Sequence, residues 1–144
     1  TSVAALGVAA HETGHAIQHD VGYAPLGLRS MLVPLANFGS KLAMPLILLG
    51  LVLTFMEQFS YTLVYLGIAC FGLSLVFQLV TLPVEFNASR RAIETLERSG
   101  ILAGTELDGA KKVLGAAALT YVAAALTSAM QLLRLVLLSR RRRN

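Results

Sequence analysis

The stretch YTLVYLGIACFGLSLVFQLVTLPV, residues Tyr61 to Val84, contains no charged side chain. At about 1.5 Å of rise per residue, a helix of this length crosses the roughly 30 Å hydrocarbon core of a bilayer. It is the clearest membrane-spanning segment of the chain, and Pro83 is expected to end it. The stretch therefore predicts an all-α integral membrane protein.

The flanking segments extend this prediction to about three membrane helices. Residues 42–56 lack charge and form a membrane helix of marginal length, whose short exit from Glu57 to Ser60 reverses the chain into a hairpin with residues 61–84. Residues 85–112 are charged and predict an aqueous helix followed by a glycine-punctuated loop. A third membrane helix is expected at residues 113–138, and its many small residues predict a span packed inside the protein.

The composition agrees with a single membrane domain of 144 residues. It is 56% hydrophobic and only 14% charged, with a mean hydropathy of +0.68, whereas soluble domains carry roughly 25% charged residues. The single Cys70 excludes an internal disulfide and, lying mid-membrane, is expected to be a small hydrophobic residue. Because the chain begins at Thr1, inside what reads as a helix, we expect an N-terminal part to precede it.

The net charge of +4 does not indicate a nucleic-acid partner. Four of the basic residues are consecutive, Arg140 to Arg143, and the sequence has no Trp and no alternation of basic and aromatic residues. The run is typical of an anchor at the membrane surface, with a specific lipid or partner site as the alternative.

Residues 1–20 predict a helix that carries a metal-binding motif. Thr1 or Ser2 can cap it, and His11-Glu12-Thr13-Gly14-His15 is H-E-x-x-H. Histidines four residues apart project from one helix face, so both can bind one Zn²⁺. Glu12 then lies beside the metal, where a carboxylate can take a proton from an activated water and deliver it to the leaving amine.

A catalytic zinc needs a third protein ligand. His19 lies roughly 12 Å further along the helix axis than His11, too far to reach the same ion. Glu85 is the better candidate, because a hairpin of two spans returns the chain to the side of the membrane that it left. The alternative is an interfacial carboxylate that pairs with Arg90 or Arg91.

Several runs of sequence resemble the YugP-like family of bacterial membrane zinc metallopeptidases. They are SVAALGVAA before the H-E-T-G-H motif, GYAP behind it, LPVEFNASRRA at residues 82–92 and AAALTYVAA at residues 116–124. The resemblance covers nearly the whole chain and implies a neutral zinc endopeptidase of the HtpX-like plan, with a Glu on a later helix as third ligand, which falls on Glu85. In that plan an Asp commonly follows the ligand Glu by four positions, whereas this sequence has Ser89 there, with Asn87 as the nearest amide.

Several side chains could stabilise an oxyanion or support the ligands. Asn87, Arg90, Tyr23 and Tyr121 all have suitable donors. For Tyr121 the alternative is a packing residue of the third span, and for Arg90 it is an ion pair with Glu94.

Together these features predict a membrane-embedded zinc endopeptidase. It would hold one Zn²⁺ per chain on His11, His15 and Glu85, use Glu12 as general base, and act on a protein or peptide substrate. The alternative is a non-catalytic membrane scaffold or partner-binding protein with a structural or vestigial zinc site. A metal transporter is less favoured, because no span carries a ligand-type residue at mid-depth.

The basic residues bear on location. The basic residues flanking the spans on the side of the motif outnumber the arginine run, so the positive-inside rule favours a cytoplasmic active site, and the family resemblance implies a bacterial inner membrane. The four arginines would then lie outside if the third segment crosses fully, and the alternative is that this segment re-enters the membrane without crossing it. The sequence makes no prediction of oligomeric state.

Overall fold

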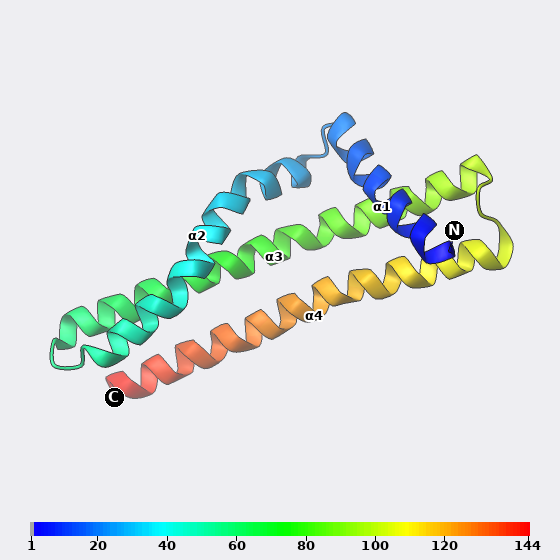
Figure 1. The fold of residues 1–144 in the computed structure, drawn as a ribbon. Coiled ribbons are helices and arrows are strands. Elements are labelled where there is room, and N and C mark those ends of the chain that lie inside the picture. Colours follow the sequence, from blue (N-terminus) through cyan, green and yellow to red (C-terminus); the bar gives the residue numbers. More distant parts are fainter. Residues whose placement is uncertain (1) are drawn as a thin grey trace. The chain divides into compact units, whose positions relative to one another are not determined.

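The computed structural model describes residues 2–144, which form four helices and no strand (Figure 1). The helices are α1 (Val3–Asp20), α2 (Ala24–Val52), α3 (Glu57–Ser99) and α4 (Gly104–Arg143). Helices α2, α3 and α4 are each long and apolar enough to cross a membrane. The prediction of an all-α fold with three potential membrane helices is confirmed.

Helix α1 forms where the sequence predicts it. The side chain of Ser2 caps its start by accepting a hydrogen bond from the backbone N–H of Ala5 at 3.1 Å. Gly22, with φ of +65°, ends the helix and turns the chain toward α2. Thr1, the other predicted cap, lies outside the described residues.

The remaining helices are longer than predicted. Helix α2 begins at Ala24 and includes Lys41, and α3 continues through Pro83 to Ser99, so Pro83 does not end the helix. Only residues 100–103 separate α3 from α4, and Gly109 lies within α4 instead of in a loop. Proline removes one backbone bond, but a helix at a membrane has few other partners for its backbone and so continues.

The chain forms two compact units, of which the first is Thr1–Arg29 with Val80–Ala123. Its core joins α1 to the C-terminal part of α3 and the N-terminal part of α4 (Figure 1). Alanine and leucine side chains form this core, and the alanines let the helix backbones approach closely. The buried residues of this core are Ala10, Ala92, Leu96, Leu102, Leu107, Ala110 and Leu114.

The second unit, Ser30–Leu79 with Ala124–Asn144, contains the predicted hairpin of α2 and α3. A Cβ added to Gly39 would lie 2.9 Å from the carbonyl oxygen of Cys70 on α3, so this contact requires glycine. At the turn, Ser60 donates a hydrogen bond to the carbonyl of Gly50, and Arg142 donates to Ser60 Oγ at 2.9 Å. Arg142, at least, is therefore tied to the hairpin and is not only a solvated anchor.

The prediction that the third span is packed inside the protein is wrong for the described chain. Only 17% of the most apolar window of α4 is buried. Leu119, Leu126 and Met130 are all more than 60% exposed. Small residues allow another helix to approach closely, but their presence does not determine whether a helix lies there.

Candidate metal centre

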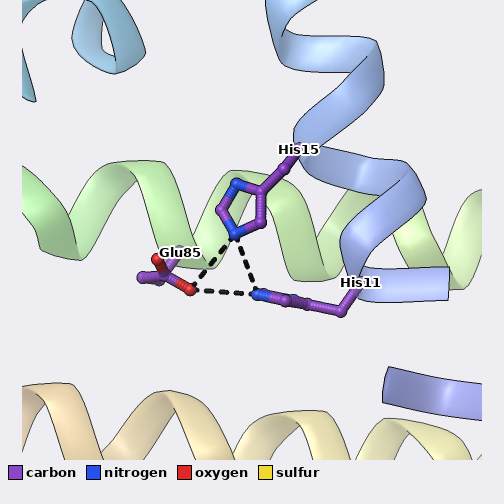
Figure 2. Close-up of side chains that lie close together, drawn as sticks. All are labelled: His11, His15 and Glu85. Atoms are coloured by element: carbon purple, nitrogen blue, oxygen red, sulfur yellow. Dashed lines mark hydrogen bonds and ion pairs between the residues drawn. The ribbon is translucent and has the colours of Figure 1, made fainter. Parts of the chain in front are cut away.

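Three predicted ligands converge in the first unit (Figure 2). His11 Nε2 lies 3.0 Å from Glu85 Oε2 and 3.1 Å from His15 Nε2, and His15 Nε2 lies 3.6 Å from the same carboxylate oxygen. The histidines are neighbours on one face of α1, and Glu85 comes from α3. We call His11, His15 and Glu85 the ligand triad.

The spacing of the triad atoms fits a zinc ion. Ligands at 2.0–2.1 Å from a tetrahedral Zn²⁺ are about 3.3 Å apart, in the middle of the observed separations. Two imidazoles and one carboxylate are a donor set that zinc accepts, and three protein ligands leave a fourth position open. Within residues 2–144 the triad is the one group of three or more His, Cys, Asp or Glu side chains arranged to hold a metal.

Gln18, which is fully buried, orients the imidazole of His15. Its amide Nε2 donates to the carbonyl oxygen of Val84 at 2.7 Å and to Asn87 Oδ1 at 3.0 Å, so its Oε1 faces His15 Nδ1 at 2.9 Å. An amide oxygen only accepts, and His15 Nδ1 therefore donates. In the neutral ring this leaves the Nε2 lone pair directed at the triad.

Ser89 supports His11 in a similar way. Its Oγ lies 3.1 Å from His11 Nδ1, on the side of the ring away from Glu85. A hydroxyl accepts as well as donates, so it can take the Nδ1–H and leave Nε2 free for a metal. The residue four positions after Glu85 thus contacts a triad histidine although it is not the acidic residue common in HtpX-like proteins.

The carboxylate of Glu85 is held from both sides. The residue is only 2% exposed; its Oε1 accepts a hydrogen bond from Arg29 at 3.0 Å, and its Oε2 faces the two histidines. The alternative of an interfacial carboxylate paired with Arg90 or Arg91 does not match this arrangement. Arg91 donates instead to Asn87.

Two further polar residues of α1, Glu12 and His19, lie outside the triad. Glu12 is exposed, and within residues 2–144 its carboxylate makes no hydrogen bond or ion pair. It is therefore available to a substrate or a water. His19 is exposed in the last turn of α1 and is not part of the triad, as the sequence predicts.

The candidate oxyanion or supporting residues differ in position. The side-chain oxygen of Asn87 accepts bonds from Gln18 and Arg91, so Asn87 supports the ligands indirectly. Arg90 is exposed and makes no ion pair in the described part of the chain, including the one expected with Glu94. Tyr121 lines a cavity of about 110 Å³ together with members of the triad.

Sequence reasoning did not assign Gln18 or Arg29 to the site. Gln18 could have been found, because it follows His15 by three residues and so shares its helix face. Arg29 lies 56 residues from Glu85, and no local pattern joins the two.

Comparison with known proteins agrees with the geometry. Residues 1–140 match the family described as "Putative neutral zinc metallopeptidase". The chain is 48% identical over 137 residues to the "Putative membrane protease YugP" of Bacillus subtilis (strain 168), an alignment that covers 95% of this chain and 59% of that relative. The chain thus spans less than two thirds of the relative's length. No solved structure matched it.

Proposed function

The chain belongs to the family described as "Putative neutral zinc metallopeptidase", and from this premise we propose that it is a membrane-embedded zinc endopeptidase acting on protein or peptide substrates. The observation that supports this most directly is the convergence of His11 Nε2, His15 Nε2 and Glu85 Oε2 within 3.6 Å of one another. Structural zinc sites are closed by four protein ligands, whereas a three-ligand set leaves room for water and substrate.

The side chains around the triad have distinct roles in this proposal. One zinc ion per chain would supply Lewis-acid activation of a water molecule and of the peptide carbonyl. Glu12, exposed and unpaired, accepts a proton from the attacking water and then delivers it to the leaving amine. Tyr121 is the best-placed donor to the developing negative charge, because its side chain lines the cavity beside His11 and Glu85.

The proposal also includes a location. Three helices are long enough to span a membrane, and the similar Bacillus subtilis protein is described as "Putative membrane protease YugP". Both observations support insertion in a bacterial inner membrane. Lys and Arg flanking the spans near the motif outnumber those of the arginine run, which favours a cytoplasmic active site.

Zinc content tests the proposal without a known substrate. The protein would be purified in detergent, and zinc per chain measured by elemental analysis beside Glu85→Ala and Glu12→Gln. We expect about one zinc in the parent, the same in Glu12→Gln and a strong reduction in Glu85→Ala.

If the parent protein hydrolyses an unfolded protein substrate and the Glu12→Gln variant does not, the result would support both the endopeptidase activity and the role of Glu12 as general base. A parent without zinc after reconstitution, or full zinc in Glu85→Ala, would refute the ligand set. Zinc binding combined with equal function of parent and Glu12→Gln would favour the scaffold alternative.

A further inference from the structure

A cavity of about 110 Å³ opens directly beside the ligand triad. It lies between α1, α3 and α4, all within the first unit, and His11 and Glu85 form its polar end. Ser89 also lines the cavity, next to His11. The rest of the lining is apolar except for the hydroxyl of Tyr121, and it comes from Val8, Leu114, Ala117, Ala118 and Tyr121.

The position of the cavity determines what can enter it. A peptide carbonyl bound next to the triad places the side chain of a flanking residue within a few ångströms of the same two ligands. Apart from the phenol of Tyr121, the ionisable groups that line the cavity are His11 and Glu85 at its polar end, so a charged side chain further inside would lose its hydration without gaining an oppositely charged partner. An apolar side chain gains free energy by leaving water there.

The volume of the cavity limits the size of the side chain that can bind in it. An apolar cavity of about 150 Å³ accommodates benzene, so a cavity of 110 Å³ suits a smaller aliphatic group better than an aromatic ring. The small side chains of Ala117 and Ala118 leave this space open, because a larger side chain at either position would occupy part of the cavity.

We infer that this cavity is a specificity pocket that selects a small aliphatic side chain, of valine or leucine size, beside the bond to be cleaved. The inference rests on the proposed function, because the pocket matters for cleavage only if the triad holds the metal. The preferred substrates are therefore apolar peptide segments that contain aliphatic residues and lack bulky aromatic residues at this position.

Binding of hydroxamic acids tests the pocket without relying on turnover. Three peptide hydroxamates would be used that differ only in the side chain beside the zinc-binding group: glycine, leucine and tryptophan. Affinity would be measured by calorimetry on the zinc-loaded protein in detergent. We expect the leucine compound to bind about tenfold or more tightly than the glycine compound, and the tryptophan compound to bind no better than glycine.

Ala117→Leu and Ala116→Leu form a matched pair. Both alanines are exposed on α4, but only Ala117 lines the cavity. Ala117→Leu should abolish the preference for leucine over glycine while zinc content stays at the parental value, and Ala116→Leu should keep that preference.

The outcomes separate this inference from the proposed function. Equal affinities of the parent for leucine and tryptophan compounds, or identical behaviour of the two alanine variants, would overturn the pocket and leave the zinc site intact. A zinc-loaded parent that binds none of the compounds would overturn the open catalytic site, and the pocket with it.

Discussion

At the scale of single residues, the buried amide of Gln18 determines how His15 can act. Its two donated hydrogen bonds fix the amide, and its oxygen then requires the proton of His15 to be on Nδ1. Replacing Gln18 by Met keeps the volume but removes this restraint. We expect zinc affinity to fall about 10–100-fold, the usual effect of losing a partner of a ligand histidine, as measured by competition with a chelator.

The control for this prediction is Gln58→Met. Gln58 is exposed on α3 and belongs to the second unit, so its substitution should leave zinc affinity unchanged. If Gln18→Met binds zinc as tightly as the parent, the orientation of His15 does not depend on the amide.

Arg29 makes a different contribution, because its partner is a buried charge. It donates to Glu85 Oε1, whose side chain is 3% exposed, so removal of the guanidinium takes the positive charge away from a buried carboxylate and leaves it with the two histidines and the hydroxyl of Tyr121. Arg29→Met should destabilise the metal-free protein by about 2–3 kcal/mol. Zinc would neutralise part of the same charge, and the loss should be smaller in the zinc-loaded protein.

Thermal unfolding in detergent, with and without zinc, measures both effects. Arg98→Met is the control, because Arg98 is exposed and makes no ion pair among residues 2–144. An equal loss of stability in the two states would mean that Arg29 and the metal do not act on the same carboxylate.

At the scale of helices, the close contact between α1 and α3 depends on the glycine inside the motif. A Cβ added to Gly14 would collide with the backbone carbonyl oxygen of Ala88, which is rigid within α3. Gly14→Ala should therefore push α1 away from α3, separate the histidines from Glu85 and cost about 1–3 kcal/mol. Zinc content and thermal stability together report the change.

Gly7→Ala is the matched control in the same helix. A Cβ there meets its nearest neighbours, Ala110 and Leu114, at 3.9 Å, which is ordinary contact. This substitution should preserve zinc binding and could gain up to about 1 kcal/mol from helix propensity. Similar behaviour of the two variants would contradict a specific role for Gly14 in positioning the ligands.

The helices also show what could be inferred from sequence. The H-E-x-x-H spacing predicts the pair of histidines, and a hairpin predicts the return of Glu85, because both depend on periodicity and on chain direction. The end of α3 was predicted wrongly at Pro83, since a proline stops a helix only where its neighbours offer other backbone partners. The exposure of α4 could not be predicted, because its small residues show that another helix can pack closely against it but do not show which helices lie next to it.

In the candidate site, too, contacts set by local helix geometry could be predicted, whereas contacts between distant residues could not. His11 and His15 are joined by local geometry, whereas the contact of Arg29 with Glu85 depends on where α2 begins and how it leaves α1. Long-range partners of this kind require the tertiary structure.

At the scale of the whole molecule, the chain divides into two units with different contents. All triad residues and their partners Gln18, Ser89 and Arg29 belong to the first unit. The second unit contains the hairpin and the contacts of Arg142, and it holds none of these residues. The stabilising effect of a metal should therefore be local.

Hydrogen exchange after zinc removal tests this division. Zinc would link α1 to α3 across 74 residues of sequence, and binding adds its free energy only to the structure that forms the site. With zinc at about 100 times its dissociation constant, the stabilisation is about 2.7 kcal/mol, or roughly 100-fold in exchange rate. We expect a chelator to accelerate exchange up to this extent in residues 3–29 and 80–123.

The hairpin provides the internal comparison for the same experiment. Residues 30–79 should exchange at the same rate with and without zinc, whereas Arg142→Met, which removes the bonds to Ser60 and Gly50, should accelerate exchange near the turn of the hairpin. Equal acceleration of both units by the chelator would show that the chain opens as one cooperative unit. In that case the metal would stabilise the membrane hairpin as well as the site, and its role would extend beyond the chemistry of the triad.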